Sequence, residues 1–331
     1  MIATLTSSEA DAEIGQFPCV LPMKGGTDGN ANLVYATWGA LNGSRDNAVL
    51  LPSYYTGTHA QYAKLIGKGR ALDPTRYFII ATNLFGNGVS TSPSHLVNPG
   101  RFPRLTIEEN VRAQYSLLMS FGVKRLALAA GWSMGAMQAL HWAMLYPDIV
   151  RNVVAICGTA FCWPVNTAFL SSIAPILEAV PKLDETLALD LFGRAYARWA
   201  YSMEFFRSEL YRQLGFDGIQ ELLDDWGCSH QEHRAADLLA ALYAWADTAR
   251  TPETARTALS QIKARCFMLP CDTDEYFTVG DATFEASAIS CAEVRVIRSP
   301  FGHCAGAPGR FSAETDQIEL SIADALAGGP P

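Results

Sequence analysis

Residues 125–146, RLALAAGWSMGAMQALHWAMLY, decide the fold of this chain. The first six residues are a short apolar run, which predicts a buried strand. Gly131-Trp-Ser-Met-Gly135 follows at once, and we expect a helix from Met134 to Tyr146, because Pro147 ends it. A G-x-S-x-G sequence between a strand and a helix is typical of a sharp turn that presents a nucleophilic serine. We therefore expect Ser133 to be a nucleophile.

The motif needs glycine at two positions for a steric reason. The turn holds the serine in a strained backbone conformation, and side chains at Gly131 and Gly135 would collide around it. The turn also places Ser133 at the N-terminus of the following helix, where a developing negative charge is favoured.

The same alternation of strand and helix extends outward along the chain. Residues 48–53 (AVLLPS), 77–83 (YFIIATN), 150–156, 265–269 and 294–298 predict further strands. Residues 106–121 predict a helix, with a capping box of Thr106 and Glu109 at its start and Gly122 at its end. We expect an α/β fold with a mostly parallel sheet and helices on both faces.

Between residues 160 and 260 this alternation gives way to helical, aromatic-rich sequence. We interpret residues 160–260 as a helical cap inserted into a core domain made of residues 1–159 and 261–331. The aromatic side chains of this segment are expected to serve packing rather than a cofactor.

Composition excludes several classes of function. The 331 residues carry a net charge of −8 without a basic cluster, which argues against nucleic acid as a partner. No run of 18 apolar residues predicts a membrane helix, and the first 14 residues do not resemble a signal peptide.

The eight cysteines have no metal-binding spacing, so we expect reduced thiols in a cytoplasmic protein with no metal and no cofactor. Cys304 is expected to be a small packing residue.

A serine hydroxyl needs a base to become a good nucleophile. Of the six histidines, only His303 follows a predicted strand, in Ser299-Pro-Phe-Gly-His303. His141 lies in the helix after the nucleophile turn, and its side chain is expected to be packed. A carboxylate that orients the histidine is expected in the preceding loop, where Asp272 and Asp274 are both candidates. Either aspartate also suits an ordinary turn.

The charge that develops during acyl chemistry needs backbone N–H donors. We expect one from Met134, directly after the nucleophile. The second is expected from the loop Ser53-Tyr-Tyr-Thr-Gly57, with Tyr55 as the donor, although a simple glycine-containing turn fits the same pattern.

Several segments resemble the homoserine O-acetyltransferase family of α/β-hydrolases over nearly the whole chain. They are Tyr35-Ala-Thr-Trp-Gly39, Arg45-Asp-Asn-Ala-Val49, Arg76-Tyr-Phe78, residues 106–114 (TIEENVRAQ) and residues 131–140 (GWSMGAMQAL). The family's S-D-x-x-F pattern matches Thr273-Asp-Glu-Tyr-Phe277 and selects Asp274. Its G-H-D pattern matches Gly302-His-Cys304 and selects His303, and its loop donor falls on Tyr55. The resemblance also implies a homodimer formed through the cap.

The chain departs from the family at informative positions. Trp132 replaces a glycine, and Ser53-Tyr-Tyr-Thr-Gly57 replaces a His-Ala-Leu-Thr-Gly loop. Ala174 replaces a substrate-binding arginine, and residues 169–177 around it carry no charge. We expect this segment to form an apolar wall of the pocket that suits an uncharged alcohol. With these features the sequence is similar to a branch of the family that hydrolyses simple acetate esters.

We therefore expect a carboxylic-ester hydrolase that acts on a small acetate ester. Acyl transfer from acetyl-CoA to homoserine is the alternative. Tyr54 and Trp132 are bulky side chains beside the predicted site. We expect them to contact the substrate and to narrow the acyl pocket.

Overall fold

The computed structural model describes residues 12–26 and 28–328. Residues 1–11, most of the segment that does not resemble a signal peptide, lie outside the described residues. Within the described part, eight strands form one sheet in the order β1-β2-β4-β3-β5-β6-β7-β8. Strands β3 to β8 are parallel to one another, while β1 and β2 pair antiparallel with each other and β2 pairs antiparallel with β4.

Strands β3 to β7 follow the predicted apolar runs closely. Their bounds are β1 Glu13–Pro22, β2 Asp28–Trp38, β3 Ala48–Pro52, β4 Phe78–Thr82, β5 Leu126–Trp132, β6 Asn152–Ile156, β7 Arg265–Leu269 and β8 Ala292–Val294. Every residue of β3, β4 and β6 is buried. Such uniform burial is typical of parallel strands that are covered on both faces.

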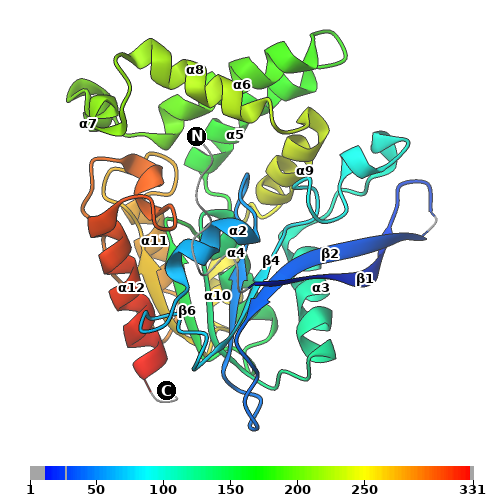
Figure 1. Cartoon of the computed structure of the whole chain (residues 1–331), viewed down its shortest axis with the longest axis vertical. Helices are drawn as coiled ribbons and strands as arrows, with labels where there is room; N and C mark the ends of the chain where they lie inside the picture. Colours follow the sequence, from blue (N-terminus) through cyan, green and yellow to red (C-terminus); the bar gives the residue numbers. More distant parts are fainter. Residues whose placement is uncertain (1–11, 27, 329–331) are drawn as a thin grey trace.

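Helices cover the two faces of the sheet (Figure 1). On one face, α3 (Ile107–Ser120) and α4 (Met134–Leu145) pack with strand residues such as Leu50. On the other face, α12 (Ser312–Ala327) packs with the neighbouring residue Val49. The capping box of Thr106 and Glu109 forms as predicted at the start of α3. Gly122, with φ of 77°, follows the end of that helix.

Two strand predictions differ from the structure. The β1–β2 hairpin was not predicted, because β1 alternates exposed and partly buried residues instead of forming an apolar run. The last strand was expected at 294–298 but lies at Ala292–Val294. Beyond Val294 only an isolated bridge joins Ile297 to Cys271, because Pro270 interrupts the neighbouring strand and has no N–H to donate.

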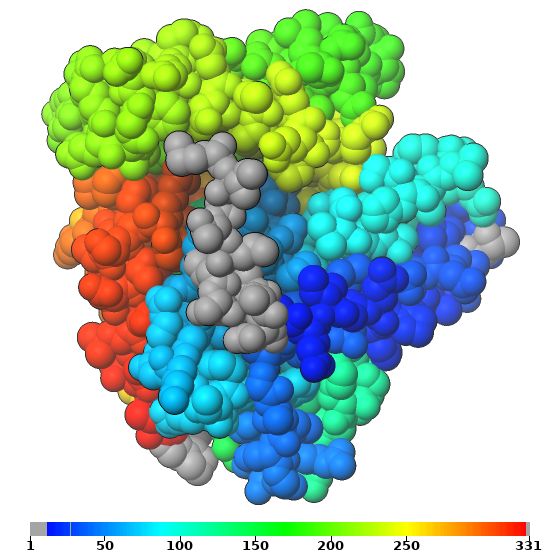
Figure 2. Space-filling view, in the orientation of Figure 1, coloured from blue at the N-terminus to red at the C-terminus, as the bar shows by residue number. Residues whose placement is uncertain are grey.

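The segment between β6 and β7 is helical. Its helices are α5 (Pro164–Glu178), α6 (Glu185–Ala200), α7 (Met203–Arg207), α8 (Ile219–His230), α9 (Ala235–Ala246) and α10 (Pro252–Leu259). In Figure 1, α6, α7 and α8 lie across the top of the view, above the sheet. The space-filling view shows them as a continuous layer over that end of the molecule (Figure 2). We refer to this segment as the cap.

Candidate active site

Ser133 occupies the turn between β5 and α4. Its backbone has φ of 58° and ψ of −124°, a conformation that L-residues rarely adopt. Such strain persists only where the surroundings enforce it, and it is common at catalytic positions. Ser133 N donates to Ile156 O at 2.9 Å, and Met137 N donates to Ser133 O at 3.1 Å, so both sides of the turn are fixed.

The glycines on either side are required by close backbone contacts. A Cβ at Gly131 would lie 2.4 Å from the carbonyl carbon of Gly135. A Cβ at Gly135 would lie 2.5 Å from the carbonyl oxygen of Pro52. Because both obstacles are backbone atoms, neither contact is relieved by a side-chain rotation, and the turn needs glycine at both positions.

His303 and Asp274 form a buried pair. His303 Nδ1 lies 2.7 Å from Asp274 Oδ2, and both side chains are nearly inaccessible to solvent. Asp274 Oδ1 accepts hydrogen bonds from Tyr276 N at 3.1 Å and Phe277 N at 3.0 Å. These two donors fix the carboxylate, so its other oxygen is directed at the imidazole ring.

Asp272, the second candidate of the same loop, makes different contacts. Its Oδ1 accepts from Ser299 N at 3.1 Å, and its Oδ2 forms an ion pair with Arg298 at 3.2 Å. Asp272 therefore joins two surface loops, and the structure brings Asp274 rather than Asp272 to His303.

Aromatic rings surround the imidazole of His303. The ring centroids of Trp132, Tyr276 and Phe277 lie 5.0, 4.4 and 5.5 Å from that of His303. Trp132 also donates from Nε1 to the carbonyl oxygen of His303 at 3.2 Å. These contacts restrict the ring and keep water away from its pair with Asp274. Among the described residues no hydrogen bond joins Ser133 Oγ to the ring, and such bonds often tighten only when substrate binds.

The two N–H groups that the sequence predicts as oxyanion donors belong to Tyr55 and Met134. In the described part of the chain, neither Tyr55 N nor Met134 N donates to a protein acceptor. Two side chains hold the Tyr55 loop against the nucleophile turn. Gln138 Nε2 donates to Ser53 O at 2.8 Å. The Tyr62 hydroxyl donates to Pro52 O at 2.8 Å and accepts from Trp132 N at 3.3 Å.

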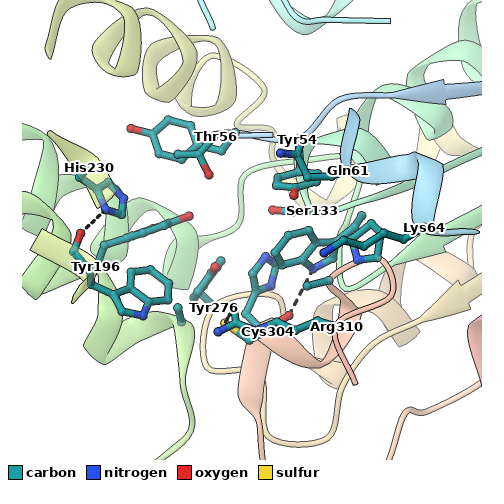
Figure 3. A pocket seen from close by; sticks show the side chains of 17 residues that line it. Tyr54, Thr56, Gln61, Lys64, Ser133, Tyr196, His230, Tyr276, Cys304 and Arg310 are labelled. Atoms are coloured by element: carbon teal, nitrogen blue, oxygen red, sulfur yellow. Dashed lines mark hydrogen bonds between the residues drawn. The ribbon is translucent and has the colours of Figure 1, made fainter. Parts of the chain in front are cut away.

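Ser133 and His303 line a common pocket of about 370 Å³ (Figure 3). This volume lies in the ~300–1,000 Å³ range of small-molecule sites. Tyr54, Tyr55 and Trp132 also line it, as the sequence predicts. The cap contributes a further wall that includes Tyr196, Trp226 and His230.

The expectation that residues 169–177 form an apolar pocket wall is wrong. None of them lines the pocket, because Phe169 stacks behind Tyr196 and Tyr276 at centroid distances of 5.2 and 4.5 Å. The absence of charge around Ala174 therefore does not describe the pocket. Two cations, Lys64 and Arg310, do line it.

Sequence reasoning missed several residues of the pocket, among them Tyr196, His230, Tyr276 and Arg310. His230 was not selected because it follows no strand, Tyr196 has no local motif, and Tyr276 occupies an unspecified position of the pattern at residues 273–277. Cys304 has the expected packing role and also a second one. Its side chain is buried in an apolar cluster, but it also lines the pocket and accepts a long contact from Arg310 at 3.8 Å.

Other features of the chain concern metals, membranes and thiols. Within residues 12–26 and 28–328, no three His, Cys, Asp or Glu side chains gather in a way that would hold a metal ion. Nor does that part of the chain contain a helix with the length and apolarity to cross a membrane. All eight cysteines are free thiols. His141 is buried as predicted, and its Nε2 lies 3.0 Å from Ala160 O.

Comparison with known proteins supports a family assignment. Residues 47–197 match the family described as alpha/beta hydrolase fold. The chain is 35% identical to an ethyl acetate hydrolase of Pseudomonas veronii, over 89% of both chains. It is 28% identical to a homoserine O-acetyltransferase of Haemophilus influenzae, over 92% of this chain and 95% of the other. The solved structure of the acetyl esterase MekB superposes with a TM-score of 0.89 at 32% identity, over 97% of this chain and 99% of that one. With a relative of this identity and coverage, the chain belongs to the α/β-hydrolase family.

Proposed function

We propose that this protein is a serine esterase that hydrolyses short-chain acetate esters. The observation that carries the proposal is the position of Ser133 on a strained turn, in one pocket with His303, whose ring is paired with Asp274. The similarity to an ethyl acetate hydrolase and to an acetyl esterase supports the same chemistry.

In this proposal Ser133 Oγ attacks the carbonyl carbon of the ester. His303 accepts the hydroxyl proton at Nε2, the nitrogen that does not face Asp274, and then donates it to the departing alcohol. Asp274 holds the Nδ1–H tautomer and stabilises the imidazolium while it carries the second proton. Backbone N–H groups of Tyr55 and Met134 stabilise the oxyanion of the tetrahedral intermediate. Water then attacks the acetyl-enzyme with His303 as base, which releases acetate and restores Ser133.

Tyr54 and Trp132 are proposed to limit the acyl group. Their rings meet edge to face with centroids 4.4 Å apart, and Trp132 also rests on His303. This aromatic pair supports a preference for acetyl over long acyl chains, since a longer chain would have to displace one of the two rings.

The direct test compares hydrolysis with acyl transfer. Purified protein is incubated with ethyl acetate alone, and separately with acetyl-CoA and homoserine. We expect acid release from ethyl acetate that is abolished in Ser133→Ala, and no O-acetylhomoserine. Formation of O-acetylhomoserine at a rate above that of ester hydrolysis would establish the transferase alternative. The cations Lys64 and Arg310 in the pocket make this comparison necessary, since a carboxylate-bearing acceptor needs a cationic partner.

We also propose that two subunits associate through the cap. Leu183, Leu187 and Leu191 follow each other at four-residue intervals and are 40%, 48% and 42% exposed. Leu187 and Leu191 lie one turn apart on one face of α6, and Leu183 directly precedes the N-cap residue Asp184 of that helix. An exposed apolar stripe of this kind favours a protein contact. Light scattering of the purified protein tests this, and Leu187→Lys with Leu191→Lys should yield monomers.

A cytoplasmic location is proposed as well. Eight free thiols, of which Cys228 and Cys291 are exposed, suit a reducing compartment. Cell fractionation tests the location.

A further inference from the structure

Buried polar atoms without a partner are concentrated in the walls of the Ser133 pocket. Six side-chain atoms of the described residues are buried without a hydrogen bond. Three of them belong to residues that line this pocket: Tyr55 Oη, Tyr276 Oη and His230 Nε2. Their side chains are at least nine-tenths buried. An unpaired buried polar group destabilises the folded state, so a cluster of three calls for a partner from outside the protein.

The tautomer of His230 follows from its neighbours. His230 Nδ1 lies 2.7 Å from the carbonyl oxygen of Trp226, which only accepts hydrogen bonds, so Nδ1 carries the proton. Burial lowers the pKa of this ring to about 4, and the ring is therefore neutral near pH 7. His230 Nε2 is then a bare acceptor, and its partner must be a hydrogen-bond donor.

Tyrosines line the pocket together with this acceptor. The ring of Tyr196 lies 5.9 Å from that of His230 and 5.8 Å from that of Tyr55, and Tyr55 and Tyr276 line the same pocket. Burial raises the pKa of all three tyrosines, so each keeps its proton and remains a donor. Figure 3 shows Tyr196 and His230 on the side of the pocket away from Lys64.

This wall combines one obligate acceptor with several donors and no charge. A carboxylate would place its negative oxygen against the lone pair of His230 Nε2. An ammonium group would find no counter-charge, since no Asp or Glu lines the pocket in the described part of the chain. A hydroxyl group both donates and accepts one hydrogen bond, and it therefore complements His230 Nε2 and a tyrosine hydroxyl together.

We propose that Tyr55, Tyr196, His230 and Tyr276 bind a free hydroxyl group on the alcohol part of the substrate. The preferred substrates are then acetate monoesters of short diols rather than acetates of simple alcohols. This inference rests on the proposed esterase function, because an acetyl group has no second polar group and only the alcohol part can carry the hydroxyl. The pocket of about 370 Å³ has room for an alcohol larger than ethanol.

The test uses pairs of esters with nearly equal size. Hydroxyalkyl acetates with two, three and four carbons in the alcohol are compared with propyl, butyl and pentyl acetate, in which a methyl group replaces the hydroxyl. For the wild type we expect kcat/KM for the best hydroxyalkyl ester to exceed that of its partner by ~10-fold or more, since a site built for a hydroxyl discriminates strongly against its absence. In His230→Phe we expect this ratio to fall to within about 2-fold of one.

Two further variants separate the subsite from a structural effect. His233→Phe changes a neighbouring cap histidine that does not line the pocket, and it should keep the wild-type ratio. Tyr276→Phe removes only a hydroxyl that has no hydrogen bond of its own, and it provides the same test if His230→Phe does not fold. Its ratio should fall as well.

The outcomes distinguish the two proposals. Hydrolysis of both esters at equal efficiency by the wild type would overturn the hydroxyl subsite and leave the esterase function intact. A strong preference that persists in both His230→Phe and Tyr276→Phe would assign the hydroxyl to another part of the pocket and also overturn it. Failure to cleave any of the esters would reject the esterase function and this inference together.

Discussion

Replacing Asp274 by asparagine separates the two aspartates of the loop after β7. Asp274 Oδ1 accepts from two backbone N–H groups, at 3.1 and 3.0 Å, while Oδ2 faces His303 Nδ1 at 2.7 Å. In the asparagine variant the carbonyl oxygen must stay with the two N–H donors, because an NH₂ group there would oppose them. The NH₂ group then faces His303 Nδ1 and favours the tautomer that is protonated at Nε2. That tautomer has no lone pair directed at Ser133.

The expected loss in kcat is ~10⁴-fold, the size found when a Ser-His-Asp triad is placed in the wrong tautomer. This factor corresponds to about 5 kcal/mol of transition-state stabilisation. The matched control is Asp272→Asn. It weakens only the ion pair with Arg298, whose side chain is 78% exposed, and leaves an oxygen for Ser299 N. We expect its kcat to change by less than about 3-fold, since an exposed ion pair contributes at most about 1 kcal/mol.

The assay is acetate release from ethyl acetate at pH 7.5, after thermal unfolding has shown that both variants are folded. Equal losses in the two variants, or a larger loss in Asp272→Asn, would refute the assignment of Asp274. A loss in Asp274→Asn of less than 10-fold would refute the tautomer argument, because the NH₂ group would then not control the ring.

Three further predictions follow from the same geometry. Ser133→Ala should lower esterase kcat by several orders of magnitude without unfolding the protein, and a fluorophosphonate probe should label only the wild type at this residue; near-normal turnover in the variant would exclude Ser133 as nucleophile. Tyr54→Ala should raise kcat/KM for hexanoyl relative to acetyl esters by about 10-fold, because it removes one ring of the pair with Trp132, and an unchanged ratio of the two esters would contradict this role. Burial lowers the pKa of both His141 and His230 to about 4, below the ~6.5 of an unfolded histidine, so their contribution to stability is complete above pH 6.5 and is lost as the pH falls toward 4. Each ring accounts for up to about 3 kcal/mol of the free energy of unfolding. Urea unfolding at pH 7 and 4.5 should therefore show a smaller acid-induced loss of stability in His141→Gln than in the wild type. Equal losses of stability would show that His141 does not contribute.

The parts of this protein that sequence predicts well are those decided by neighbouring residues. The turn around Ser133 follows from two glycines, a strand and a helix in one continuous stretch. The start of α3 follows from Thr106 and Glu109, which are three positions apart. The loops that carry His303 and Asp274 were found because each follows a predicted strand, although the last strand is shorter and earlier than expected.

The parts that sequence did not predict depend on contacts between distant segments. His230 ends α8 and Tyr196 lies within α6, and neither position has a local signal for a binding site. They reach the pocket only because the cap folds over the loops of the core. Ala174 is the opposite case. Resemblance placed this residue at the binding pocket, but it lies in a helix that does not line the pocket. The pairing of β1 with β2 escaped prediction because an edge strand needs no continuous apolar run.

The two outer strands of the sheet also bear on aggregation. An exposed strand edge offers unpaired N–H and C=O groups to any other extended chain. On one side the sheet ends in β8, which is only three residues long. On the other side it ends in β1, which carries Pro18 in its interior opposite Asn32. Proline has no N–H to donate, and within sheets it is tolerated at such edges. One edge is therefore short and the other is interrupted by a residue that cannot donate, and both features disfavour the addition of a further strand.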